Sequence, residues 1–373
     1  PKNRLFRFEQ GVLASFAVDT LEVYMTTQLK GQETYFLPFN MGKGEGIETG
    51  SGNPHNPDGV DTEYLWLDVL TMDSILQLVE SFIFYEVDKS NSKKKTLIFP
   101  RYHQRRAVSR LLEDMKTNHT DNNYLIQHSA GSGKTNTIAW LAHSLVSLHD
   151  DQNRNIVDTV LIVTDRIVVD RQLQDAVRQI SHKSGVVKVM GDRETSSDLA
   201  DAIAGNTKII ATTIHKFAQI NQSDWMSVGN TANKKFAILI DEAHSSTTGS
   251  YMSSVSQVLT ETDPENGTID EVQEVTVADA IEQEIARTGK QDNVSIIAFT
   301  ATPKATTLQL FGSTQPDGSK APFDVYSMKQ AINEGFILDV LNNYTTYKTS
   351  CKLHKAVEED PALKTPHAQR KND

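Results

Sequence analysis

The stretch Tyr-Leu-Ile-Gln-His-Ser-Ala-Gly-Ser-Gly-Lys-Thr over residues 124–135 constrains the fold of this chain more than any other. A short apolar run breaks into two glycines, a lysine and a threonine, and a segment with helical spacing follows. Gly131 and Gly133 can adopt a positive φ, so successive backbone N–H groups can wrap around a polyphosphate at a helix N-terminus. Lys134 would neutralise the β- and γ-phosphates, and the hydroxyl of Thr135 would bind Mg²⁺. The pattern predicts a phosphate-binding loop between a strand and a helix.

The spacing departs from the usual G-x-x-x-x-G-K-[ST] pattern at one place, because His128 stands where the first glycine is expected. A glycine-rich turn between a strand and a helix is the alternative interpretation. The strand pattern before the loop and the helix pattern after it favour the phosphate loop. The residues predicted to bind ATP in this loop are Gly131, Ser132, Gly133, Lys134 and Thr135.

Composition is that of an ordinary globular protein, with 373 residues, 38% hydrophobic and 23% charged, which is long enough for two domains. No apolar run reaches the length of a membrane span, and the N-terminus lacks the apolar core of a signal peptide. We therefore expect no membrane partner and a cytoplasmic location. Cys351 is the single cysteine, which excludes an internal disulfide and a cysteine-built metal site.

The net charge of −11 argues against a wholly basic nucleic-acid binder, but the charges are unevenly distributed. Residues 89–116 contain nine Lys or Arg against Glu113 and Asp114, whereas residues 257–292 contain ten Asp or Glu. A nucleic-acid partner would therefore lie beside the first of these segments. For the three lysines 93–95 taken alone, a solvated loop is an equally good interpretation.

Residues 1–90 predict a partial mixed α/β domain without a phosphate loop. It contains predicted strands within residues 21–29 and 34–39, an exposed loop over residues 42–59, and a helix over residues 74–84 with Ile75, Leu78, Val79 and Phe82 on one face. Metal-dependent DNA cleavage would need an Asp followed by Glu-x-Lys, and this segment contains no Glu-x-Lys. The abrupt start indicates that the beginning of a longer domain is missing.

From residue 96 onward, short apolar runs alternate with segments of helical length. The predicted strands are Tyr124–Gln127, Thr159–Thr164, Lys208–Thr212, Phe236–Ile240 and Val294–Phe299. Such alternation predicts a parallel sheet with helices on both faces. Ligands bind such sheets at the carboxyl ends of the strands, so polar residues are expected there.

Two carboxylates follow the fourth of these strands, in Asp241-Glu-Ala-His244. Asp241 would hold Mg²⁺, commonly through water, and Glu242 would orient the water that attacks the γ-phosphate. With Lys134 they form the predicted catalytic set. His244 could couple the ATP site to its surroundings. The alternative is a helix N-terminus with favourable acidic residues, which the upstream loop disfavours.

Further polar residues follow other strands. Thr300 and Thr302, in Thr300-Ala-Thr-Pro303, suit a coupling element better than catalysis, although alone they predict only a turn. Residues of a type that contacts phosphodiester oxygens are Arg166, Thr212 and Thr213, each of which alone is more often a helix cap or a surface residue. Gln104 carries an amide that could recognise a donor and an acceptor on adenine.

Together these motifs resemble, in order and spacing, the first RecA-like domain of superfamily-two helicases and translocases. The resemblance is closer still to the restriction (motor) subunit of type I restriction-modification enzymes. It rests on the loop at 128–135, where that family often has His at position 128, on Val163-Thr-Asp-Arg166 followed by Asp170-Arg-Gln-Leu173, and on Ala298-Phe-Thr-Ala-Thr-Pro303. Residues 16–27 and 36–40 also resemble the part of that family's nuclease domain after its catalytic carboxylates.

The resemblance implies a RecA-like fold and an ATP- and Mg²⁺-dependent motor that pulls double-stranded DNA. It implies modification (methyltransferase) and specificity subunits as partners. It divides the chain into a nuclease-type remainder (1–90), a first RecA-like domain (91–325) and a linker with the start of a second one (326–373). The family's nuclease carboxylates and arginine finger have no match here. A strand-separating helicase and a non-motor module that binds ATP or DNA stay open as alternatives.

Overall fold

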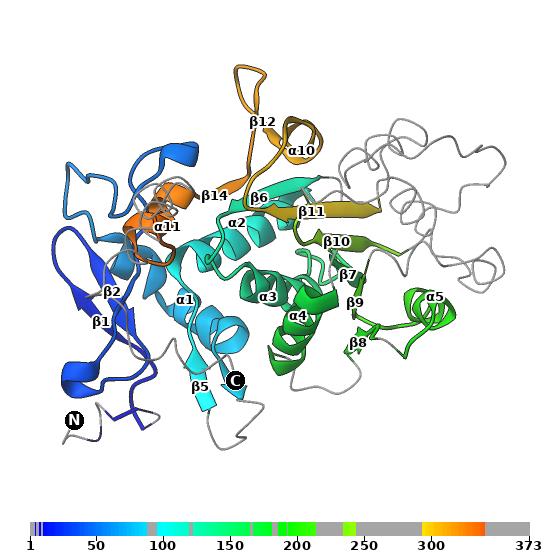
Figure 1. Cartoon of the computed structure of the whole chain (residues 1–373), viewed down its shortest axis with the longest axis horizontal. Helices are drawn as coiled ribbons and strands as arrows, with labels where there is room; N and C mark the ends of the chain where they lie inside the picture. Colours follow the sequence, from blue (N-terminus) through cyan, green and yellow to red (C-terminus); the bar gives the residue numbers. More distant parts are fainter. Residues whose placement is uncertain are drawn as a thin grey trace, which may run out of the picture.

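The computed structural model describes most of the predicted motor segment and the residues before it (Figure 1). The described residues are 4, 7–8, 10–87, 95–118, 122–164, 167–180 with side chains from 172, 186–191, 193–213, 234–243 and 293–339. Several residues named from the sequence lie outside them, namely Lys93, Lys94, Asp165, Arg166, His244, Cys351 and the acidic segment 257–292.

A parallel sheet of seven strands forms the centre of the described chain, in the order β14-β6-β11-β10-β7-β9-β8. The strands are β6 (Tyr124–His128), β7 (Thr159–Thr164), β8 (Val187–Val189), β9 (Ile209–Thr213), β10 (Phe236–Ile240), β11 (Val294–Thr300) and β14 (Asp324–Tyr326). Every residue of β7, β9 and β10 is buried, as expected of parallel strands covered on both faces.

The five predicted strands are confirmed, two of them (β7 and β10) with identical bounds and the others within one residue at each end. The sequence missed β8 and β14, which have only three residues each and therefore carry little periodic signal. Strand β14 pairs with β6, with Asp324 opposite Ile126, and forms the edge of this sheet. It lies at the predicted boundary between residues 91–325 and 326–373, and that division stays a prediction.

Helices cover both faces of the sheet, as predicted (Figure 1). The first face carries α2 (Tyr102–Asn118), α3 (Lys134–Leu145) and α4 (Ile167–Ile180), and the second carries α5 (Ser196–Ala204) and α10 (Ala305–Phe311). Side chains of a strand alternate between faces, so Val160 and Ile162 join the first core while Leu161 and Val163 join the second. This arrangement is a RecA-like fold.

The N-terminal part is mixed α/β, as predicted. It contains the antiparallel sheet β1 (Ser15–Val18), β2 (Val23–Thr26) and β3 (Leu37–Pro38), two 3₁₀ turns (Gly31–Glu33 and Gly46–Glu48), two π-helical turns (Leu65–Val69 and Leu78–Phe82), α1 (Met72–Gln77) and the hairpin of β4 (Phe84–Val87) with β5 (Lys95–Ile98). Near α10 lies the two-stranded sheet β12 (Ser313–Thr314) with β13 (Lys320–Ala321). Helix α11 (Met328–Asn333) packs instead against the 3₁₀ turn Gly46–Glu48 of the N-terminal part (Figure 1).

The helical face predicted for residues 74–84 is partly wrong. Leu78 and Phe82 are buried, but Ile75 and Val79 are 39% and 55% exposed. The α-helix gives way to a π turn, in which the Ile83 N–H donates to the Leu78 carbonyl at 2.9 Å. This i→i+5 bond breaks the 3.6-residue period on which the prediction relied.

Aromatic rings join the N-terminal part to the helices that cover the first face of the seven-stranded sheet. Phe39 lies 5.8 Å from Tyr102 of α2, and Tyr64 lies 5.0 Å from the same ring, both edge to face. In α3 the Trp140 Nε1–H donates to the Phe82 carbonyl at 2.8 Å. The two parts therefore share one continuous core. Within the described residues no helix has the length and apolar character needed to cross a membrane.

Candidate active site

The loop between β6 and α3 has the backbone geometry that a phosphate-binding loop requires. Gly131 and Gly133 have φ of 72° and 79°, and Gly133 is the N-cap of α3. A Cβ at Gly133 would lie 2.5 Å from Gln104 Nε2. Only glycine fits both this backbone conformation and this close approach.

Arg101 and the first turn of α2 hold the carbonyl oxygens of this loop. Arg101 Nη1 donates to the carbonyl of residue 131 at 2.8 Å, and Gln104 Nε2 donates to that of residue 133 at 3.0 Å. His103 Nε2 lies 3.0 Å from the carbonyl of residue 132. We call Arg101, His103 and Gln104 the carbonyl clamp. Because a trans peptide directs C=O and N–H to opposite sides, the clamp turns the N–H groups of residues 133 and 134 away from α2.

Gln104 uses both ends of its amide within the protein. Its Oε1 accepts from the Arg101 N–H at 2.9 Å, its Nε2 is committed to the loop, and the side chain is buried. The structure thus gives Gln104 a supporting contact to the phosphate loop. Recognition of adenine by this residue stays a prediction.

His128 has a structural role that explains the departure from the glycine pattern. Its carbonyl accepts from Lys134 Nζ at 3.4 Å, and its ring Nε2 lies 3.0 Å from Asp324 Oδ1. Both side chains are fully buried. Burial lowers the pKa of His128, so the ring is neutral near neutral pH. Glycine at this position would lack this side-chain contact, which adds to the backbone pairing between β6 and β14.

Two arginines complete the surroundings of Asp324. Arg106 donates from Nε and Nη2 to its two carboxylate oxygens at 2.9 and 3.0 Å, and Arg110 Nη1 donates at 3.1 Å. Burial alone would raise the pKa of Asp324, but the charge of Arg106 and the contacts with His128 and Arg106 hold it well below its usual range. The carboxylate is therefore charged at all physiological pH values.

Asp241 follows β10 directly and is 5% exposed. Its backbone N–H donates to the Val163 carbonyl at 3.1 Å, while its Oδ1 is buried and makes no hydrogen bond in the described structure. Burial, reinforced by the charge of Glu242 and opposed by Lys134, raises the pKa of Asp241 to about 6. A buried carboxylate oxygen without a donor suits a cation.

Glu242 connects the acidic pair to the loop. Its Oε1 lies 3.3 Å from Lys134 Nζ. Its φ of 55° is left-handed, which is unusual for a residue other than glycine and costs about 1–2 kcal/mol. Such strain is common where a side chain must be presented at a functional site. The fold therefore brings the predicted Lys134, Asp241 and Glu242 together.

The donor set fits Mg²⁺, which takes oxygen ligands and, in nucleotide sites, shares them between one or two protein groups and phosphates. Thr135, at the start of α3, and Asp241 are the residues that would hold it. Among the described residues, no group of three or more His, Cys, Asp or Glu side chains forms a separate metal site. The ion would polarise the γ-phosphate, while Glu242 positions water.

The predicted coupling and DNA-contacting threonines lie at the same edge of the sheet. Thr300 is fully buried and its Oγ1 accepts from the N–H of the exposed Thr302 at 3.2 Å. The Ala243 N–H donates to the carbonyl before Thr300 at 3.0 Å, which joins this turn to the acidic pair. Thr212 and Thr213 end β9, but both are buried, at 0% and 6% exposure. Their contact with DNA stays a prediction.

Sequence reasoning missed Arg101, His103 and Asp324. The first two lie within the three residues before Gln104 and could have been suspected from that proximity. Asp324 lies 196 residues from His128 and nothing in the local pattern pointed to it.

The sheet, the loop and the acidic pair define a phosphate-loop ATPase with a RecA-like fold. The model of the SWI2/SNF2 ATPase family matches residues 103–372, and the chain belongs to this family.

The resemblance to type I restriction subunits is confirmed by its curated relatives. A putative type I restriction enzyme MjaVIIIP endonuclease subunit of Methanocaldococcus jannaschii is 27% identical over 212 residues, 53% of this chain and 20% of the relative. The SsaAORF53P endonuclease subunit of Staphylococcus saprophyticus is 26% identical over 222 residues, 52% of this chain and 22% of the relative.

The matched part of the chain thus spans about a fifth of the length of these relatives. Among solved structures, the UvsW helicase from bacteriophage T4 matches with a TM-score of 0.37 and 15% identity, covering 65% of this chain and 66% of that one. The Sulfolobus solfataricus SWI2/SNF2 ATPase core in complex with dsDNA matches with a TM-score of 0.32 and 14% identity, covering 56% and 34%.

Proposed function

We propose that this chain is the ATP-hydrolysing part of a motor that translocates along double-stranded DNA, within a type I restriction endonuclease subunit. One observation carries the proposal: Lys134 on the phosphate loop lies 3.3 Å from Glu242, beside an Asp241 carboxylate whose buried oxygen has no donor. Membership of the SWI2/SNF2 ATPases and the names of the curated relatives support it.

The chemistry follows from these positions. A triphosphate on the loop would take Lys134 away from Glu242, because three phosphate groups carry more negative charge than one carboxylate. Glu242 would then be available to orient the attacking water, and Asp241 with Thr135 would hold Mg²⁺. His244, Thr300 and Thr302 are proposed to transmit the change, and Arg166, Thr212 and Thr213 to contact the DNA backbone.

The remaining parts of the proposal concern the whole subunit. We propose that residues 1–90 end a nuclease-type domain, that residues 91–325 form the first motor domain, and that residues 326–373 lead into a second one. DNA cleavage would then come from a nuclease centre outside this chain. Modification and specificity subunits are the proposed protein partners, since the relatives are named as endonuclease subunits of type I enzymes.

The test is Lys134→Ala in the complete subunit. We expect DNA-stimulated ATP hydrolysis to fall at least about 100-fold, because the charge that stabilises the transferred phosphate is lost. Lys116→Ala is the matched control, since Lys116 lies near the far end of α2 and, among the described residues, forms an ion pair with the exposed Asp151. Wild-type turnover in Lys134→Ala would overturn the assignment of the loop.

A second measurement separates translocation from strand separation. A translocase on duplex DNA should displace a triplex-forming strand with ATP while leaving a blunt duplex paired. Efficient unwinding of the blunt duplex by the complete subunit would instead make the protein a strand-separating helicase.

A further inference from the structure

The helical segment that precedes the hairpin β4–β5 carries an exposed apolar face. Four of its side chains, at the helical spacing i, i+3, i+4 and i+7, are exposed to solvent, namely Met72, Ile75, Leu76 and Val79. We call these four residues the outer face. We propose that the outer face binds a basic amphipathic helix of a separate protein. This interaction goes beyond ATP hydrolysis and does not depend on it.

The inner side of the same segment packs on the core. Leu78 and Phe82 are buried, and Arg105 of α2 donates from Nη2 to Ser74 Oγ at 2.7 Å. A helix that is apolar on two sides is typically covered on both. In the described part of the chain the outer face stays exposed, with Met72 at 72% and Leu76 at 59%. The face therefore has the character of a contact surface for another molecule.

The apolar surface extends into the π turn before α1. Trp66 and Leu67 of that turn are 45% and 64% exposed. Leu67 also lines a pocket of about 360 Å³, together with Val60 and Tyr64. A pocket beside an exposed apolar face can take one large side chain of a partner, which is how interfaces concentrate binding energy.

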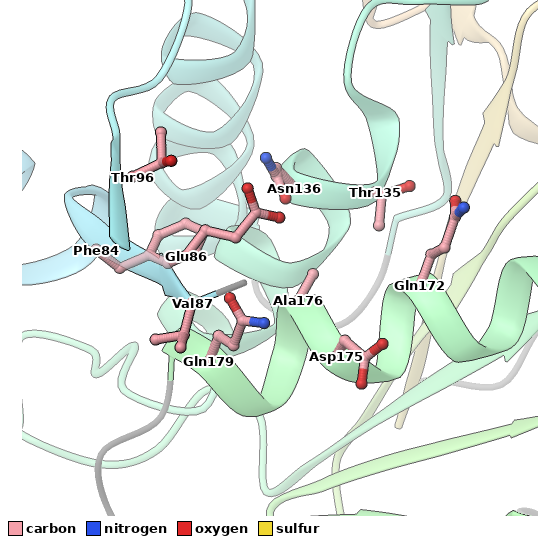
Figure 2. Close-up of a pocket in the computed structure, with 10 residues that line it drawn as sticks. All are labelled: Phe84, Glu86, Val87, Thr96, Thr135, Asn136, Gln172, Asp175, Ala176 and Gln179. Carbon is pink, nitrogen blue, oxygen red and sulfur yellow. The ribbon is translucent and has the colours of Figure 1, made fainter. Parts of the chain in front are cut away.

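The charges around the outer face have one sign. Residues 44–88 contain ten Asp or Glu and no Lys or Arg, and Asp73 and Glu80 are exposed beside the outer face. The acidic character continues in the hairpin, where Glu86 and Asp175 of α4 line a separate pocket of about 640 Å³ (Figure 2). A partner with apolar residues on one face and Lys or Arg at its edges would match this surface.

The same charges disfavour other occupants. A second copy of the outer face would bring acidic residues against acidic residues, and an anionic lipid surface would also be repelled. The arginines of α2 are already paired, Arg105 with Asp68 and both Arg106 and Arg110 with Asp324. The helical spacing of the outer face suits a helix. The occupant is therefore a helix from outside this chain.

The probe is a synthetic amphipathic helix of leucine and lysine, and its control has glutamate in place of lysine. Fluorescence anisotropy of the labelled peptides measures their affinity for the 373-residue chain. The lysine peptide should bind at least about 10-fold more tightly than the glutamate peptide, because its charge is complementary. Added salt should reduce this difference. Equal binding of the two peptides would overturn the charge argument.

Variants place the binding on the outer face. Met72→Gln combined with Leu76→Gln should weaken the lysine peptide at least about 10-fold, because two apolar side chains are lost from the interface. Leu338→Gln, at an exposed leucine after α11, is the matched control and should bind as wild type does. If the double variant melts earlier than wild type, Val79→Gln makes the same comparison at a single position. Wild-type affinity in the variants would overturn the proposal.

Two further measurements test the source of the occupant. Sedimentation of the 373-residue chain should show a monomer over the concentrations used. A dimer that the double variant abolishes would assign the outer face to a second copy and overturn the proposal. The complete subunit should bind the lysine peptide as the 373-residue chain does. Binding by the chain but not by the complete subunit would show that the subunit covers its own outer face, which would overturn a separate partner.

Discussion

At the residue scale, the candidate site consists of three charged side chains, Lys134, Asp241 and Glu242. Lys134 Nζ and Glu242 Oε1 form an ion pair at 3.3 Å. The neighbouring Asp241 is buried, and its Oδ1 accepts no hydrogen bond from the described residues. Burial and the charge of Glu242 raise the pKa of Asp241 to about 6, so the folded state disfavours the charged form of this carboxylate. A buried carboxylate of this kind lowers the stability of the protein unless a cation binds beside it. Groups with strongly shifted pKa values are typical of functional sites.

This cost predicts how stability depends on pH. Because the native pKa of Asp241 lies above its ordinary value of 3.8, the native state holds the proton more tightly than the unfolded chain. The resulting stabilisation is present below about pH 4 and is lost as the pH rises through about 6. Asp241→Asn removes the charge, so without Mg²⁺ and nucleotide the variant should be more stable than wild type by roughly 1–3 kcal/mol at about pH 8.

Denaturant unfolding of both proteins between about pH 4 and pH 8 measures this difference. The two stabilities should converge at the acid end. Parallel curves across the whole range would contradict the burial of a titrating Asp241 carboxyl.

At the element scale, the first turn of α2 shapes the phosphate loop from outside. The carbonyl clamp engages three consecutive carbonyls, through Arg101 just before α2 and through His103 and Gln104 in its first turn. Arg101 also stacks on Phe336, at 3.7 Å from the guanidinium carbon to the ring centre, just after α11. The loop therefore has its shape set by α2 and by the segment that follows the sheet.

Gln104→Ala tests this role of the clamp. Loss of one hydrogen bond to the loop should weaken nucleotide binding about 3–10-fold. Because Gln104 acts on the loop, the loss should be equal for ATP, GTP and tripolyphosphate. Gln77→Ala removes an amide from the N-terminal part and serves as control. A loss confined to ATP would show instead that Gln104 contacts adenine.

An element could be predicted from the sequence where it has a local pattern of its own. The strands carrying long apolar runs, the loop and its glycines were predicted because each satisfies a local rule of hydrophobic period or backbone conformation. The helix over residues 74–84 was only partly predicted, because the π turn at Leu78 changes the period. The clamp and β14 could not be predicted, since side-chain contacts between α2 and the loop, and pairing of a three-residue strand, depend on the tertiary fold.

At the scale of the whole molecule, Asp324 joins parts that are far apart in sequence. Asp324 pairs with Arg106, and Arg106 also donates to the Met41 carbonyl at 3.0 Å, which connects Asp324 to the N-terminal part. Asp324 also contacts His128, the last residue of β6, after which the phosphate loop begins. One carboxylate thus holds β14, α2 and β6 in a single arrangement.

Asp324→Ala should lower the free energy of unfolding by roughly 3–5 kcal/mol, because it leaves buried positive and polar groups without their partner. The pKa of Asp324 is lowered in the fold, so the advantage of wild type is present above its ordinary value of 3.8 and shrinks as the pH falls below it. Denaturant titration at neutral pH provides the measurement. The exposed Asp58→Ala should stay within about 0.5 kcal/mol of wild type, and an equally small effect at Asp324 would contradict the argument.

The edge position of β14 also sets an order of events during protein synthesis. The strand that carries the phosphate loop emerges from the ribosome 196 residues before the carboxylate that its histidine contacts. At about 5–20 residues per second, translation of the interval takes roughly 10–40 seconds. During that time the nascent chain contains the phosphate-loop sequence but not Asp324, the partner of His128. The contact between His128 and Asp324 can therefore form only after β14, the edge strand of the described sheet, has been translated.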